Sequence, residues 1–128
     1  MAANKTTYLE DRMLNHFLRN TASTAPTTVY LALYSAAPGE AGGGTELTGN
    51  GYAREAITFG APSDGVVNNS NTITFTASGG AWSQILGHAI LDASSGGNMF
   101  YYESVTGPTL ADGDSYEFGA NDVTVTET

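Results

Sequence analysis

Hydrophobic and polar positions alternate with a period of two along most of the chain. In the segment 29–34, Val or Leu occupies every second position, and Tyr or Ala lies between them. Successive side chains of a strand point to opposite faces, so this segment predicts a strand with one buried face and one partly covered face. Similar runs cover the segments 52–60, 71–77, 82–93, 98–105, 114–118 and 121–127. The sequence therefore predicts seven or eight strands, at the spacing of an antiparallel sandwich or barrel.

A helical period occurs near the N-terminus. Thr7 and Glu10 have the spacing of a capping box, which predicts a helix that begins near Tyr8. Apolar residues then recur at helical spacing and form one stripe, made of Leu9, Met13, Phe17 and Leu18. The simpler expectation is that this stripe packs on the protein's own sheet, and the alternative is that it packs on a neighbouring subunit.

The order of these elements predicts the fold class and the domain division. No amphipathic helix recurs between the strands, which argues against a parallel sheet with crossover helices. We therefore expect a mainly β protein, an antiparallel β-sandwich with one short N-terminal helix. Residues 1–27 form an N-terminal arm and helix, and residues 28–128 form a single β-sandwich domain.

The stretch from Ala37 to Glu55, APGEAGGGTELTGNGYARE, is rich in glycine and polar residues. A phosphate-binding loop would need a helix directly after it, whereas the next residues alternate as a strand does. The stretch is therefore predicted to be a long surface loop between two antiparallel strands. Its glycines would also allow another chain to approach closely.

Charge is distributed unevenly along the 128 residues. Thirteen acidic residues and four basic residues give a formal net charge of −9. The bases are Lys5, Arg12, Arg19 and Arg54. Because binding to phosphates or anionic lipids needs clustered basic residues, neither nucleic acid nor a membrane surface is an expected partner. The acidity either serves solubility alone or leaves the basic N-terminal segment to dock on a partner.

Further composition and motif searches restrict the chemistry. There is no Cys, and the apolar runs are too short for a membrane helix or a signal core, so we expect a soluble chain without a secretion signal. His16 and His88 lack a nucleophile motif such as G-x-S-x-G. His88 alternates with apolar residues and is expected to be a hydrogen-bonded sheet residue, not a general base.

Two further motifs have competing interpretations. Asp112-Gly113-Asp114 is expected to be a turn between strands, because the spacing of a full calcium loop is missing. Trp82 is expected to anchor the core, with exposed stacking on a sugar as the alternative. No enzymatic activity, cofactor or metal is expected.

Four longer segments resemble a known family. VYLALYSAAPGEAGGGTEL and GNGYAREAITF resemble the opening of a group of small tailed-bacteriophage virion proteins. LGHAILDASSGGNMFYYESV and ADGDSYEFGANDVTVT are similar to that group's later segments, so the resemblance covers about residues 28–126. Members are often labelled tail fibre proteins, while proteins similar to them decorate heads as cement proteins with jelly-roll-like folds.

The resemblance implies a structural role in the virion and transfers no catalytic residue. Our leading hypothesis is a capsid cement protein of jelly-roll type, a homotrimer that binds the major capsid protein on the capsid exterior. The alternative is a tail or fibre component that binds a host receptor. The residues expected to contact the capsid or a sister subunit are Lys5, Arg12, Phe17, Arg19, Gly42, Gly43, Gly44 and Arg54. Deleting residues 1–20 is expected to leave a folded protein that no longer decorates heads.

Overall fold

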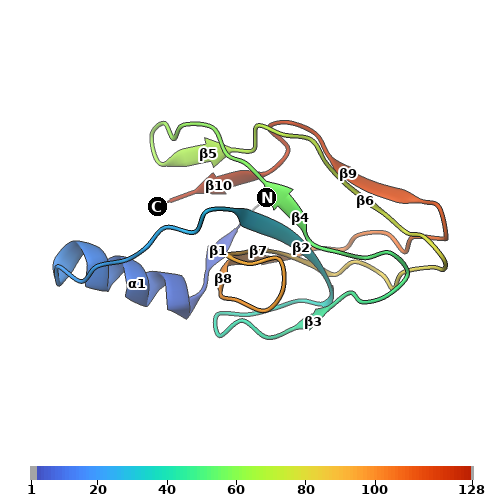
Figure 1. Cartoon of the computed structure of the whole chain (residues 1–128), viewed down its shortest axis with the longest axis horizontal. Helices are drawn as coiled ribbons and strands as arrows, with labels where there is room; N and C mark the ends of the chain where they lie inside the picture. The colour runs from blue at the N-terminus through green and yellow to red at the C-terminus, as the bar shows by residue number, and fades with distance from the viewer. Residues whose placement is uncertain (1–2, 128) are drawn as a thin grey trace.

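The computed structural model describes residues 3–127, which form one helix and ten strands (Figure 1). The helix is α1 (Thr7–Leu18). The strands are β1 (Asn4–Lys5), β2 (Val29–Ala36), β3 (Thr45–Glu46), β4 (Glu55–Ile57), β5 (Val66–Asn68), β6 (Ile73–Thr76), β7 (Gly87–Leu91), β8 (Met99–Ser104), β9 (Ser115–Phe118) and β10 (Thr124–Thr126). The predicted mainly β fold with one short N-terminal helix is confirmed.

The largest sheet is antiparallel and has the strand order β1-β8-β7-β2-β3, with β4 also paired to β2. The two short strands β3 and β4 follow one another along the same edge of β2, where Tyr34 faces Glu46 and Val29 faces Ile57. Between them the chain leaves the edge, and Tyr52 fills the gap. Its hydroxyl accepts a hydrogen bond from the Leu33 amide at 3.0 Å and donates one to Glu46 at 2.7 Å.

A second layer faces this sheet and consists of two antiparallel strand pairs, β6 with β9 and β5 with β10. Figure 1 shows these pairs on the opposite side of the molecule from β7 and β8. The core between the layers contains Leu31, Leu33, Leu47, Ile57, Ile73, Phe75, Ala77, Trp82, Ile85, Ile90, Leu110, Val123 and Val125. The sandwich architecture fits the prediction, and jelly-roll connectivity stays a prediction.

Trp82 is a core anchor, as predicted. Only 4% of the residue is exposed, and its indole N–H donates to the Asn50 carbonyl at 2.8 Å. The strand predicted over 82–93 begins only at Gly87, because the preceding amides of Trp82 and Ile85 bond to the carbonyls of Leu110 and Pro108 in a loop. Strands β1, β3 and β5 are two or three residues long, and pairing partners far away in the sequence create them.

Helix α1 begins one residue earlier than predicted. Thr6, not Thr7, is the N-cap: its hydroxyl accepts from the Leu9 amide at 3.3 Å and donates to the Met99 carbonyl at 2.6 Å. Immediately before it, β1 pairs with β8 and extends the main sheet. Deleting residues 1–20 would therefore remove an edge strand as well as the helix, so substitutions on α1 test its role more cleanly.

The glycine-rich segment 37–44 folds back over the outer face of the main sheet. Pro38 is buried, and a Cβ placed on Gly87 would lie 3.0 Å from the Ala37 Cα. The amide of Thr7 donates to the Glu40 carbonyl at 2.8 Å, which ties the segment to the start of α1. The predicted surface loop is thus packed against the sheet on one side. A phosphate-binding loop would be followed by a helix, but the stretch 37–55 leads into strand β4.

Replacing Gly44 by Ala is expected to lower the free energy of unfolding by about 2 kcal/mol. Gly44 has φ +75°, and an added Cβ would lie 2.6 Å from the Ala36 carbonyl oxygen. Gly43 is the matched control, because its φ is +73° but nothing lies within 4 Å of its Cβ position. The Gly43→Ala protein should lose only about 1 kcal/mol in urea denaturation. Equal decreases in unfolding free energy for the two variants would show that the close contact with the Ala36 carbonyl does not affect stability.

Candidate interaction surface

The far end of α1 presents large apolar side chains to solvent. Leu14 is 54% exposed, Phe17 is 74% exposed and Leu18 is 76% exposed, and none of the helix residues is buried. The expectation that the apolar stripe packs on the protein's own sheet is therefore wrong for Phe17 and Leu18. Figure 1 shows the reason: the helix starts at the edge of the main sheet and runs away from the strands.

The first turns of α1 hold the helix against β8. The Tyr8 ring stacks on the Phe100 ring with centroids 6.0 Å apart. The guanidinium of Arg12 lies 5.8 Å and 5.9 Å from the centroids of these two rings. It donates hydrogen bonds to the Tyr8 hydroxyl, the Ser23 hydroxyl and the Thr24 carbonyl. Arg12 thus fastens the arm after the helix to the helix itself, through hydrogen bonds at the surface.

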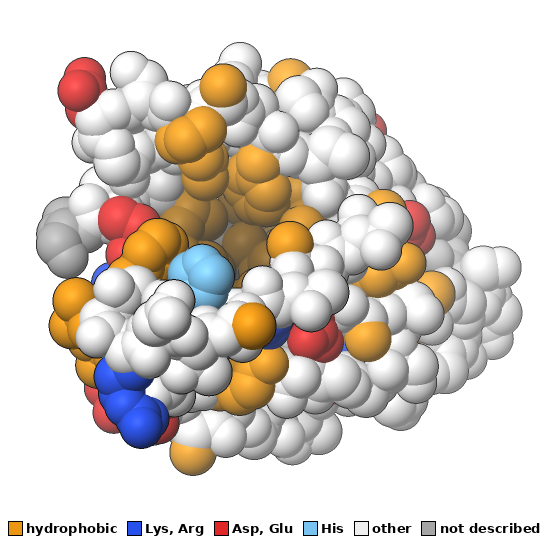
Figure 2. Space-filling model, turned by 60° about the vertical axis from the view of Figure 1, so that its left-hand side comes forward, with side chains coloured by type: hydrophobic (Ala, Val, Ile, Leu, Met, Phe, Trp, Pro, Cys, Tyr) orange, Lys and Arg blue, Asp and Glu red, His pale blue; other side chains and the backbone are white. Residues whose placement is uncertain are grey.

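An apolar hollow lies beside the helix, as the space-filling view shows (Figure 2). Two adjacent cavities of about 230 and 210 Å³ form it, and Phe100 lines both. The first lies against α1 and contains Leu9, Met13 and Phe17. The second is lined by Val29, Phe59, Val67, Ile90, Phe100, Tyr101 and Val125. With the exposed end of α1 it forms the apolar attachment face, which we define as Leu14, Phe17, Leu18 and this hollow.

Lys5 and Arg19 lie at the two ends of the N-terminal segment. The Lys5 ammonium lies 2.6 Å from the Glu127 carboxylate, so it joins β1 to the end of the chain. Burial opposes ionisation of Glu127, but hydrogen bonds from Lys5 and Tyr101 outweigh it and hold the pKa of Glu127 below its ordinary value. Arg19 is exposed and bonds to the Asn15 side chain at 2.8 Å. Of these two bases, Arg19 is the more exposed.

Arg54 is enclosed by its own chain. Its side chain is 8% exposed, and it pairs with Glu46 through two hydrogen bonds of 2.8 and 2.9 Å. It also donates to the carbonyls of Ala93 at 2.7 Å and Gly96 at 2.8 Å. The hydrogen bonds with Glu46 raise the pKa of Arg54. The guanidinium therefore serves the fold and offers little surface to a partner.

The ionised form of Glu46 is stabilised by its contacts with Arg54 and Tyr52. Burial opposes its ionisation, but the hydrogen bonds from Arg54 and Tyr52 outweigh burial and lower the pKa of Glu46. The same cluster raises the pKa of Tyr52, chiefly because the ring is buried. Gly42, Gly43 and Gly44 lie nearby in the segment over the outer face of the sheet, at the opposite end of α1 from Phe17 and Arg19.

His88, Asp112 and Asp114, which the sequence analysis considered for catalysis or metal binding, form hydrogen bonds within the fold. His88 is buried in β7, where its two ring nitrogens lie 3.0 Å from Glu103 and 2.9 Å from the Tyr116 hydroxyl, so the predicted sheet role is confirmed. Asp112 and Asp114 accept backbone amides of Gly79 and Ala111, which confirms the predicted turn. Among residues 3–127, no group of three acidic, His or Cys side chains is arranged to hold a metal ion.

Leu14 is the member of the attachment face that sequence patterning alone left out. It lies outside the predicted stripe of Leu9, Met13, Phe17 and Leu18, but it adjoins that stripe because it stands four residues before Leu18. With Leu14 included, the apolar surface of α1 is wider than the predicted stripe. The four-residue spacing of Leu14 and Leu18 is the sequence signal that could have included Leu14.

A known protein family matches the chain. The profile of a family described as "Podophage GP4 fiber I protein gp80" matches residues 4–126. No curated protein matches the chain. In the part of the chain that the structure describes, α1 lacks the length and apolar character needed to cross a membrane.

Proposed function

The chain belongs to the family of the podophage GP4 fibre I protein gp80 and is a bacteriophage virion structural protein, and on this premise we propose that it attaches to another virion protein through its apolar attachment face. The observation that carries the proposal is the exposure of Phe17 and Leu18, which are 74% and 76% accessible on a helix otherwise fixed to the sandwich. Exposed clusters of large apolar side chains mark protein contact sites.

The name of the family favours a place among the fibre proteins, where this domain would be one structural subunit of a fibre. Capsid cement on the outside of the head is the second candidate. A self-contained sandwich with its attachment face at one end also suits a decorating subunit, because many weak contacts on one shell add together. In either place, sister copies in a homotrimer are the proposed neighbours, together with the fibre proteins or the major capsid protein.

The place on the particle can be measured directly. Tailless heads and complete particles from the same phage are separated, and antibody labelling of the protein is viewed by electron microscopy. A fibre subunit is expected on complete particles at the tail region and not on tailless heads. A cement protein is expected on both, spread over the head surface. Labelling of neither particle would reject a virion attachment role.

We also propose that the protein acts without catalysis, nucleic acid or membrane lipid. This is supported by His88, Arg54 and Lys5, whose polar atoms form hydrogen bonds within the fold. The net charge of −9 opposes contact with phosphate groups.

A further inference from the structure

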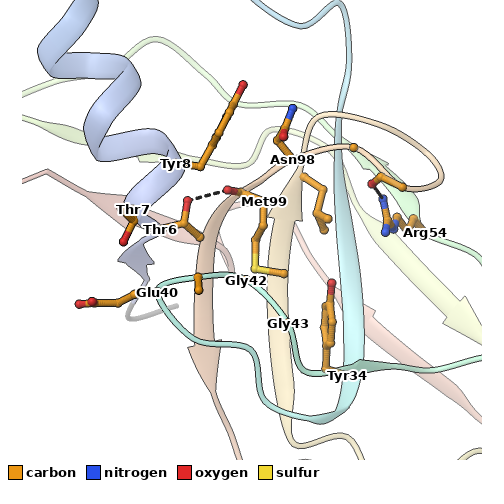
Figure 3. Close-up of a pocket in the computed structure, with 14 residues that line it drawn as sticks. Thr6, Thr7, Tyr8, Tyr34, Glu40, Gly42, Gly43, Arg54, Asn98 and Met99 are labelled. Atoms are coloured by element: carbon orange, nitrogen blue, oxygen red, sulfur yellow. Dashed lines mark hydrogen bonds between the residues drawn. The ribbon is translucent and has the colours of Figure 1, made fainter.

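A third cavity, of about 370 Å³, lies over the outer face of the main sheet. The first turn of α1, the glycine segment and the loop 92–98 surround it, and Tyr34, Leu91 and Met99 form its floor. Figure 3 shows these segments around the opening, with the Tyr34 hydroxyl and the Met99 side chain directed into it. Its size is within the range of small-ligand pockets. It is separate from the apolar attachment face.

Tyr34 has an unusual environment in this cavity. The residue is only 4% exposed, yet none of the hydrogen bonds among residues 3–127 involves its hydroxyl. The oxygen is not sealed off either, because every fully enclosed side-chain oxygen and nitrogen in this part of the chain has a partner. Burial, followed by the charge of Glu46, raises the pKa of Tyr34 to about 12. The hydroxyl is therefore protonated at neutral pH and can both donate and accept a hydrogen bond.

The lining restricts the chemistry of a ligand. An anion would find no free base in the described lining, because the guanidinium of Arg54 is already bonded to Glu46 and to the carbonyls of Ala93 and Gly96. A purely apolar ligand would leave the Tyr34 hydroxyl without a partner, which carries a desolvation penalty. Leu91 and Met99 nevertheless offer an apolar floor, and Thr7 and Asn98 add polar groups at the rim.

We propose that this cavity binds a neutral polyhydroxylated ligand of monosaccharide size, in which one ligand hydroxyl bonds to the hydroxyl of Tyr34. A sugar ring combines hydroxyl groups with C–H faces, and the floor supplies a partner for each. Tyr34 fixes the orientation, while Leu91 and Met99 pack against the C–H face. The site does not depend on the attachment role of α1.

The test titrates the full chain with glucose, galactose, N-acetylglucosamine and rhamnose, and follows binding by NMR. At least one sugar is expected to bind with a dissociation constant of roughly 1–10 mM, the range of a single small site. The Tyr34→Phe protein should bind that sugar about tenfold more weakly, because one hydrogen bond is lost without a change of shape. The Tyr30→Phe protein is the matched control: Tyr30 lies on the same strand and face, outside the cavity.

A second variant tests whether binding needs access to the cavity, independently of the Tyr34 hydroxyl. Ala41 is exposed at the rim, so Ala41→Trp should block the opening without disturbing the floor. Loss of sugar binding in this protein, with an unchanged melting temperature, supports the site. Absence of binding by all four sugars at about 50 mM overturns the proposal. Equal binding by the wild-type, Tyr34→Phe and Ala41→Trp proteins also overturns it. Neither result bears on particle attachment, which is measured separately.

Discussion

Phe17→Ser combined with Leu18→Ser is expected to leave a folded protein that binds to particles about 100-fold more weakly. Large apolar anchors at the centre of an interface each contribute roughly 1–2 kcal/mol or more when truncated. Both side chains are more than 70% exposed in the isolated chain, so little packing is lost within the fold. Unfolding free energy should change by less than about 0.5 kcal/mol. Co-sedimentation with particles that lack the protein measures the binding.

The control for this variant lies at the other end of the molecule. Ala81 and Ala111 are exposed apolar residues a few positions after β6 and before β9. Figure 1 shows β6 and β9 on the other side of the molecule from α1. The Ala81→Ser, Ala111→Ser protein carries the same number of apolar-to-serine changes and should bind particles as the wild type does. If the α1 variant also bound normally, the exposed helix would not be the attachment site.

Arg54→Ala is expected to lower the free energy of unfolding by about 3 kcal/mol at neutral pH. Removal of one partner from a buried ion pair typically costs about 3–5 kcal/mol, and the partial exposure of Glu46, at 24%, places this pair at the low end. The variant also removes the hydrogen bonds from Arg54 to the carbonyls of Ala93 and Gly96, so the loop 92–98 is no longer joined to the segment next to β4. Urea denaturation measures the loss, and hydrogen exchange locates it in this loop.

The effect of Arg54→Ala should depend on pH. The pKa of Glu46 in the folded protein is below the ordinary value of 4.5. A lowered pKa contributes stability that is present above 4.5 and is lost as the pH falls through the folded value. The difference between the two proteins should therefore be greatest near neutral pH and narrow below about pH 4.5. A difference that stayed constant down to pH 3 would show that Glu46 is not the group that Arg54 stabilises.

Local patterning predicts the elements where the pattern is long. The alternation over residues 29–34 identifies β2 and its buried face, since Leu31 and Leu33 are fully enclosed. The helix is also predicted, within one residue at its start. The shortest strands are not, because two residues such as Thr45 and Glu46 carry too little pattern. Their structure comes from β2, whose edge they pair with.

For the candidate site too, the sequence identifies residues but not their contacts. The basic residues and the glycine segment can be read from the sequence, but their roles depend on what each of them meets. Arg54 meets Glu46, Ala93 and Gly96, which lie 8, 39 and 42 positions away in the chain. No local pattern encodes such a distance, so the internal contacts of Arg54 could not be predicted from the sequence.

The sequence by itself determined the mainly β class, the N-terminal helix, the core position of Trp82 and the membership of a phage structural family, because each depends on neighbouring residues or on the order of segments. Only the tertiary structure decided that Phe17 and Leu18 stay uncovered, that Arg54 is enclosed and that Tyr34 points unpaired into a cavity. Exposure is a property of what lies across space from a side chain. Segments distant in the chain supply those neighbours, and the fold alone brings them together.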